Sequence, residues 1–205
     1  MLKFNIFAKF ANVEHGIMEK GDKVPQGVVY GEQTHKDKAV WVTKQTAGVI
    51  KNTDALVSKE NGIALGLKTA DCVPILFFEP HANIIGAIHA GWRGTALEIT
   101  RKTLEFLRMK PFNILVGIGP AICPNCFVVG KEVARQFSAS LVQEVGDNQY
   151  SVDLWQANVE QCLEVGIPER NIEVMRTCTY ETASFYSVRK GCTKTDRNIS
   201  FIKRI

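Results

Sequence analysis

The feature that most constrains this sequence is a pair of short, continuous apolar runs, Val73 to Phe78 and Ile114 to Ile118. Both are far shorter than the ~18 consecutive apolar residues of a membrane span. Runs of about four to eight apolar residues are typical of strands buried in a core. A chain of 205 residues can bury such a core without stabilising cross-links such as disulfides. We therefore expect residues 1–205 to form a single domain with no membrane contact.

Apolar and alternating segments predict further strands along the chain. The opening segment, Met1 to Lys9, alternates apolar and polar residues as a first strand does. The other predicted strands are Gly27–Tyr30, Ala39–Val42, Ala64–Lys68, Val73–Glu79, Ile84–His89, Ile114–Ile118 and Ile172–Arg176.

Three helices are predicted. Thr95 with Glu98 forms a capping box that predicts a helix starting at Thr95. A second helix is expected over Lys131–Ser138, and a third follows the capping residue Asp153 and ends near Gly166. Strands outnumber helices and do not alternate with them regularly, so the fold class is mixed α+β rather than a doubly wound sheet.

Net charge and cysteine content indicate which binding partners and which cellular compartment to expect. The net charge is +4, and the basic residues are scattered, which argues against nucleic acid and suits a small anionic substrate. Six cysteines in a sequence without an export signal indicate a reducing compartment. We expect a cytoplasmic monomer or small homo-oligomer.

Three residues with metal-binding side chains stand beside predicted strands: His35, Cys72 and His89. Each alone also fits a structural role, since a histidine at a strand end is often only hydrogen-bonded. A cysteine beside an apolar run is often a small buried hydrophobe. No H-x-x-x-H or paired C-x-x-C spacing ties the three together.

Several sequence blocks carry a family resemblance. The most specific is His89–Gly94, HAGWRG; the others are Thr69–Pro74, Gly117–Ile122, Gln33–His35, Asp153–Asn158, Cys178–Thr179 and Phe185–Arg189. They resemble the signature blocks of the YfiH-like family, described as a polyphenol oxidase or laccase domain and associated with purine nucleoside phosphorolysis. The likeness runs from about residue 24 to residue 205. It implies an α/β sandwich with mixed β-sheets flanked by helices, and a metal, usually zinc, bound by His35, Cys72 and His89.

The chemistry of those three side chains agrees with the implied metal. One cysteine and two histidines leave a fourth tetrahedral position open, as in catalytic zinc sites. Zinc there lowers the pKa of a bound water to about 7. Asp71, next to Cys72, either orients a ligand and moves protons or forms a turn.

Two arginines are candidate anion contacts. Arg93 lies between glycines, directly before the predicted helix at Thr95, where a helix N-terminus favours phosphate. Arg189 is the second candidate. The family's double arginine followed by aspartate appears here as Arg189-Lys190-Gly191, and lysine lacks the bidentate fork of arginine.

A second departure concerns residues 123–129. The glutamate that the family places after its Gly-Pro block is replaced in Cys126-Phe127-Val128-Val129, so an acid role there is doubtful. Cys123 and Cys126 form a C-x-x-C absent from the family pattern. A structural zinc ribbon needs a second such pair, and a redox role needs a specific fold context, so we interpret them as thiols without a role.

The resemblance implies a zinc-dependent purine nucleoside phosphorylase that converts adenosine, inosine and methylthioadenosine to the free base and ribose 1-phosphate, with adenosine deaminase activity. In that reading Asp71, Cys72 and Arg93 are catalytic, and Arg93 and Arg189 bind substrate.

Other functions stay open. Two histidines and one cysteine also suit a single copper ion and phenol oxidation. Multicopper chemistry would need roughly ten histidines, and the chain has four. Cys72 with His89 could instead act as a cysteine or zinc hydrolase that cleaves an amide of a cell-wall precursor. A non-enzymatic binding module is the last alternative.

Overall fold

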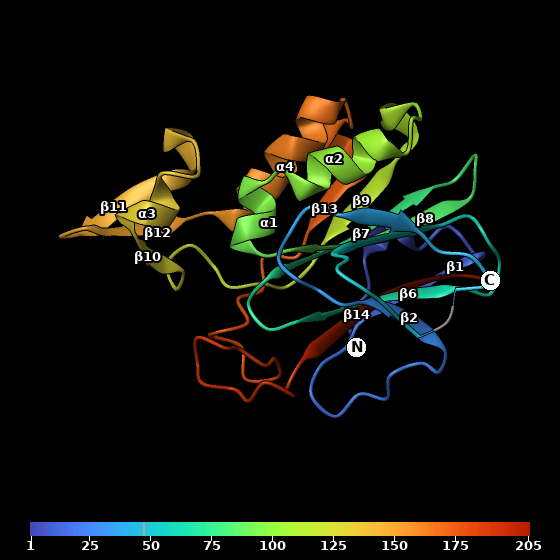
Figure 1. Ribbon diagram of the computed structural model, residues 1–205, viewed down its shortest axis with the longest axis horizontal. Coiled ribbons are helices and arrows are strands. Elements are labelled where there is room, and N and C mark those ends of the chain that lie inside the picture. The colour runs from blue at the N-terminus through green and yellow to red at the C-terminus, as the bar shows by residue number, and fades with distance from the viewer. Residues whose placement is uncertain (47) are drawn as a thin grey trace.

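The computed structural model describes residues 1–46 and 48–205, and two mixed β-sheets face each other at its centre (Figure 1). The five-stranded sheet pairs β1 with β14 and β14 with β6 in antiparallel fashion, whereas β6, β2 and β4 are parallel. In spatial order its strands are β1 (Val13–Ile17), β14 (Asn198–Arg204), β6 (Ala64–Thr69), β2 (Val28–Gly31) and β4 (Val49–Ile50).

The six-stranded sheet is also mixed. Its four central strands, β9, β7, β8 and β5, are antiparallel to one another. The edge strand β13 is parallel to β9, and the edge strand β3 is parallel to β5. In spatial order the strands are β13 (Ile172–Val174), β9 (Leu115–Ile118), β7 (Val73–Glu79), β8 (Ile84–Ala90), β5 (Ala55–Ser58) and β3 (Ala39–Trp41).

Helices cover the face of the six-stranded sheet that points away from the other sheet (Figure 1). They are α1 (Trp92–Ala96), α2 (Ile99–Phe106) and α4 (Leu154–Val165). A small sheet of β10 (Val128–Gly130), β12 (Gln149–Val152) and β11 (Val142–Gly146) projects from this body together with α3 (Lys131–Ala134). In the part of the chain that the structure describes, no helix has the length and apolarity to cross a membrane.

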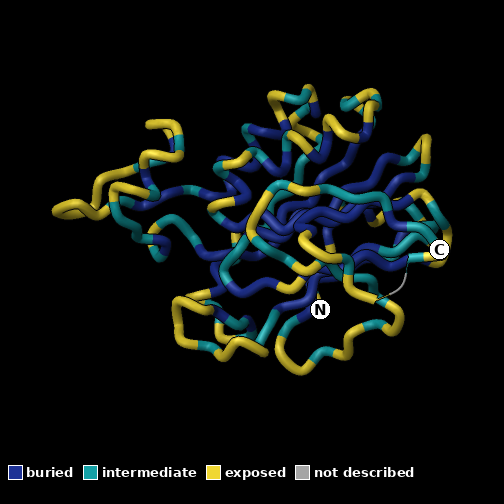
Figure 2. The backbone as a smooth tube through the Cα atoms, viewed as in Figure 1, coloured by how far each residue is buried: buried dark blue, intermediate teal, exposed yellow. Residues whose placement is uncertain are grey.

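Strands β7 and β8 are buried along their whole length because both faces of their sheet are covered (Figure 2). Successive side chains of a strand point to opposite faces. Ile75 and Phe77 therefore pack toward the helices, and Leu76 and Phe78 pack toward the five-stranded sheet. This two-sided burial explains why the sequence shows a continuous apolar run rather than an alternating one.

The predicted fold class is confirmed: mixed sheets are flanked by helices. All seven predicted strands outside the N-terminal segment are present, with bounds shifted by up to two residues. Helix α4 starts after Asp153, whose carboxylate accepts from the Gln156 N–H at 2.8 Å, and Gly166 ends it with φ +99°. The predicted helix at Lys131–Ser138 is shorter, ending at Ala134.

Two local predictions are wrong. Residues 1–9 form a 3₁₀ helix at Asn5–Phe7 rather than a strand, and only Leu2 bridges to Ile17. Thr95 does not start a helix: it lies inside α1, and its hydroxyl is directed to the Ala90 carbonyl and the Asn158 amide. The next helix, α2, begins after Glu98, which has φ +61°.

His15 on β1 gives the fold a dependence on pH. Its ring lies against Phe4 and Phe7, is 4% exposed, and its Nε2 accepts the Phe4 N–H at 2.9 Å. Burial, helped by the charge of Lys3, lowers the pKa of His15 to about 4. Below a pH of about 6.5, His15 therefore binds a proton more readily in the unfolded chain than in the folded one.

We expect the free energy of unfolding to fall by roughly 3 kcal/mol as the pH drops from about 6.5 to below 4, because His15 must be protonated inside the core. Urea titrations between pH 7 and pH 4 measure this slope. A His15→Gln variant keeps a hydrogen-bond acceptor but has no proton to take up, so its slope should be shallower. Equal slopes in the two proteins would contradict the assignment to His15.

Candidate metal centre

His35, Cys72 and His89 come together at one end of the two large sheets. His35 lies in the turn after β2, Cys72 lies in the turn between β6 and β7, and His89 is on β8. The antiparallel register of β7 with β8 places Pro74 opposite His89, which brings Cys72 to the same end of the pair. One donor atom from each of the three residues lies within 4.8 Å of the other two.

Asp54, directly before β5, holds two of these three residues in place. Its Oδ1 contacts His89 Nδ1 at 2.8 Å and also accepts the His35 N–H at 2.9 Å. Its Oδ2 accepts the N–H groups of Thr34 and Lys36 at 3.0 and 3.1 Å, and the Thr34 hydroxyl at 3.1 Å. These bonds stabilise the turn in which His35 has φ +60°, a backbone conformation that is uncommon outside glycine.

Gly91, directly after β8, leaves room for the cluster. A Cβ atom at this position would lie 2.9 Å from His35 Cδ2 and 3.0 Å from Cys72 Sγ. Both distances are shorter than ordinary van der Waals contact, so any side chain here would push the two donor residues apart.

The charges in the cluster favour a thiolate at Cys72. Burial raises the pKa of the Cys72 thiol, but the positive charge of His89 and hydrogen bonds from His35 and His89 outweigh it and lower that pKa. Burial lowers the pKa of His89, but the Cys72 thiolate and Asp54 outweigh it and raise that pKa. Burial likewise raises the pKa of Asp54, whereas its bonds to His89 and to backbone N–H groups bring it down to about 2. The thiolate is the form of cysteine that binds metals.

The donor set fits a metal ion such as zinc. Zinc bonds of about 2.0–2.3 Å in tetrahedral geometry separate the donor atoms by about 3.3 to 3.8 Å. The donor atoms here lie within 4.8 Å of one another, close to that range. Because His89 Nδ1 is bound to Asp54, its Nε2 is the nitrogen left for a ligand bond. A carboxylate behind a histidine is the usual support of a metal-binding imidazole.

A pocket of about 220 Å³ opens beside the three side chains. Two basic residues, Lys68 and Arg197, line it, and none of its described lining residues is acidic. Gln33 fixes one wall, because its amide group donates to the Lys68 carbonyl and accepts the Lys68 N–H. The Lys68 ammonium lies 4.7 Å from the centroid of the Tyr30 ring, and Tyr30 is not among the lining residues, so Arg197 is the better candidate for an anion contact in the pocket.

Asp71 lies beside the cluster but its carboxylate points elsewhere. It accepts the Thr179 hydroxyl and the Arg189 N–H, both at 2.8 Å. With φ +86°, Asp71 forms the turn between β6 and β7. The bonds described for Asp71 match the turn-forming alternative. The contact to a metal-binding side chain that the sequence suggested for Asp71 is made by Asp54 instead.

Neither predicted anion-binding arginine lines the pocket. Arg93 is the second residue of α1, so it stands in the first turn of a helix that begins at Trp92 rather than at Thr95; its guanidinium stacks on Trp92 at 4.2 Å. Arg189 donates to the carbonyl oxygens of Cys126 and Val128 at 3.2 and 3.1 Å. Sequence reasoning missed Asp54, Lys68 and Arg197, and only Asp54 had a local signal, an acidic residue before the apolar run Ala55–Val57.

Known proteins resemble most of this chain. The model of a family described as multi-copper polyphenol oxidoreductase laccase matches residues 11–205. A purine nucleoside phosphorylase of Bacteroides thetaiotaomicron is 34% identical over 91% of this chain and 76% of the relative. Adenosine deaminase RL5, from an unknown prokaryotic organism, is 33% identical over 82% of this chain and 68% of its own length. The crystal structure of YlmD from Geobacillus stearothermophilus superposes with a TM-score of 0.80 at 34% identity, covering 87% of this chain and 73% of that one.

Proposed function

The chain belongs to the family described as multi-copper polyphenol oxidoreductase laccase, and from this premise we propose that it is a metal-dependent purine nucleoside phosphorylase. The observation that carries the proposal is the cluster of His35, Cys72 and His89 beside a pocket lined by two basic residues. The names of several relatives, purine nucleoside phosphorylases and one adenosine deaminase, supply the substrate class.

Zinc is the ion that we propose for the three donors, with copper as the alternative. A bound zinc ion supplies Lewis-acid polarisation of the substrate and of a coordinated water. Three protein ligands leave one position for that purpose, as in catalytic zinc sites. Asp54, which contacts His89 Nδ1, would orient the ring so that Nε2 is the nitrogen available to the ion.

Arg197 supports the phosphate half of the reaction. It lines the pocket, and its guanidinium is oriented by the carbonyl oxygens of Thr193 and Asp196 at 3.0 and 2.6 Å. Fixed positive charge near the reacting atoms attracts phosphate and stabilises negative charge that develops on it. In phosphorolysis a phosphate oxygen bonds to C1′ of the ribose as the bond from C1′ to the base breaks, so the products are the free base and ribose 1-phosphate.

Adenosine, inosine and methylthioadenosine are the proposed substrates, and adenosine deamination is a second proposed activity. The likeness to adenosine deaminase RL5 supports the deamination. Zinc deaminases replace the exocyclic amine of a base by water with the help of a metal-polarised water. The same donor cluster supports both reactions, and the presence of phosphate in the assay distinguishes them.

We do not extend the multi-copper chemistry named in the family description to this chain. Copper oxidases with several metal ions rely on imidazole ligands. Of the four histidines, His15 is buried against Phe4 and Phe7, and His81 lies exposed in the turn after β7. Only His35 and His89 remain for a metal at this site, enough for one copper ion at most.

Chromatography of adenosine incubated with the purified protein tests the proposal. We expect adenine and ribose 1-phosphate to appear only when phosphate is present, and inosine to appear with or without it. A chelator that strips the metal should stop both reactions, and added zinc should restore them. A metal-loaded protein that releases neither adenine nor inosine would refute the nucleoside assignment.

A further inference from the structure

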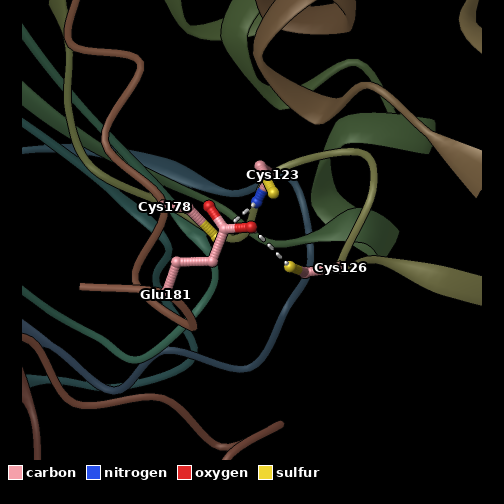
Figure 3. Close-up of side chains that lie close together, drawn as sticks. All are labelled: Cys123, Cys126, Cys178 and Glu181. Carbon is pink, nitrogen blue, oxygen red and sulfur yellow. Dashed lines mark hydrogen bonds between the residues drawn. The ribbon is translucent and has the colours of Figure 1, made fainter. Parts of the chain in front are cut away.

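A second cluster of metal-binding side chains lies apart from the pocket. Cys123, Cys126, Cys178 and Glu181 each offer one donor atom, and the four atoms lie within 4.8 Å of one another (Figure 3). Cys123 and Cys126 come from the C-x-x-C before β10, and Cys178 and Glu181 come from the segment after β13. All three cysteines are free thiols.

Backbone hydrogen bonds already shape both segments around this cluster. Cys126 and Phe127 both donate their N–H groups to the Cys123 carbonyl, at 3.0 and 2.9 Å, which folds the C-x-x-C into a tight turn. Thr179 donates its N–H to the Ala121 carbonyl at 3.0 Å, which joins the two segments. The Cys123 N–H also points at Cys178 Sγ at 3.3 Å, the kind of bond that stabilises a metal-bound thiolate.

We propose that Cys123, Cys126, Cys178 and Glu181 bind a second zinc ion, which has a structural role. Tetrahedral zinc with bonds of about 2.3 Å to sulfur holds its sulfur ligands about 3.8 Å apart. The four donor atoms, within 4.8 Å of one another, lie near that spacing. Three thiolates favour zinc over hard cations such as magnesium, and the Glu181 carboxylate completes the four ligands. On binding, each thiol releases its proton to water.

Two basic side chains offset the charge of such a site. A zinc ion with three thiolates and a carboxylate carries a net charge of about −2. The Arg189 guanidinium contacts the Cys126 carbonyl at 3.2 Å, and Lys190 Nζ contacts the Tyr180 carbonyl at 3.3 Å. Both cations are therefore bound to the backbone of the two ligand-bearing segments.

In this proposal, the second zinc site stabilises the turn that carries Cys72, a residue of the first cluster. Asp71, next to Cys72, is held by three groups: the Ile122 N–H on its carbonyl, and the Thr179 hydroxyl and Arg189 N–H on its carboxylate. Ile122 and Thr179 are each adjacent in sequence to a proposed ligand. An ion that joins the two segments thus fixes the turn that carries Cys72.

Zinc content measured by mass spectrometry on reduced, zinc-saturated protein tests the proposal. We expect about two zinc ions per chain in the wild type, about one in Cys126→Ser, about one in Cys72→Ala and none in the double variant. The Cys72→Ala background separates this site from the proposed catalytic one, so nucleoside turnover plays no part in the result. Cys192→Ser is the matched control, because Cys192 is a partly buried thiol outside both clusters and should leave both ions bound.

Alkylation mapping of the wild type provides a test that needs no folded variant. Zinc should protect Cys123, Cys126 and Cys178 from alkylation and leave Cys192 unchanged, and Glu181→Gln, which alters an exposed side chain, should weaken that protection. The proposal is overturned if Cys126→Ser binds as much zinc as the wild type. Equal alkylation of the three thiols with and without zinc, or a disulfide among them in the zinc-saturated protein, would overturn it as well.

Discussion

A Cys72→Ala variant should lose the metal ion that we propose at His35, Cys72 and His89, and about 10³-fold or more of the proposed nucleoside turnover. The thiolate is the anionic donor of the His35–Cys72–His89 cluster, and two neutral imidazoles alone bind zinc weakly. Several kcal/mol of metal-derived stabilisation of the transition state would be lost, and about 1.4 kcal/mol corresponds to a tenfold change in rate. Zinc per chain and adenine release, measured on the same preparation, report the two effects together.

The outcome also separates the zinc centre from a cysteine nucleophile. The lowered pKa of Cys72 beside His89 would suit a thiolate that attacks a substrate directly. A nucleophile needs no metal, so a metal-free wild type with full activity would reject the zinc mechanism and favour that alternative. Cys192→Ser, which changes a thiol outside both clusters, should retain the metal content and turnover of the wild type.

The central strands could be predicted because their environment is encoded locally. Burial on both faces favours apolar residues along β7 and β8, where Glu79 and His89 are the exceptions, and that pattern is visible in the sequence. Strands β1, β5 and β14 were missed because buried polar residues, His15, Ser58 and Ser200, interrupt their apolar pattern. The helix predicted from the Thr95 capping box does not start at Thr95, because the turn at Gly91 starts a helix earlier. The Thr95 side chain instead hydrogen-bonds to Ala90 and Asn158.

The candidate sites depend on residues that are distant in sequence, and the sequence alone did not bring them together. Asp54 contacts His89 across 35 positions, because β5 and β8 are neighbours in the sheet. The C-x-x-C at Cys123 has no second pair in the sequence. Cys178, 55 positions away, lies beside it in the fold because Ala121 pairs with Cys178. Family resemblance supplied His35, Cys72 and His89, and it did not supply the residues that support them.

An Asp54→Asn variant should bind the metal about 10- to 100-fold more weakly and lose roughly 2–3 kcal/mol of unfolding free energy. Both carboxylate oxygens are acceptors here: Oδ1 serves His35 and His89, and Oδ2 serves Thr34 and Lys36. An amide has only one acceptor oxygen, so its NH₂ group must face donors on one side. The buried mismatch should loosen either the His35 turn or the His89 ring, and each carries a proposed ligand of the ion.

Competition with a chelator measures the metal affinity of this variant, and urea unfolding of the metal-free protein measures its stability. Asp153→Asn is the matched control, since at the start of α4 the amide keeps an oxygen for the Gln156 N–H. That control should change neither quantity by more than a few tenths of a kcal/mol. Wild-type metal affinity in Asp54→Asn, with or without a loss of stability, would show that Asp54 supports only the fold. The orientation of His89 would then have to come from the packing of β8 between its neighbouring strands.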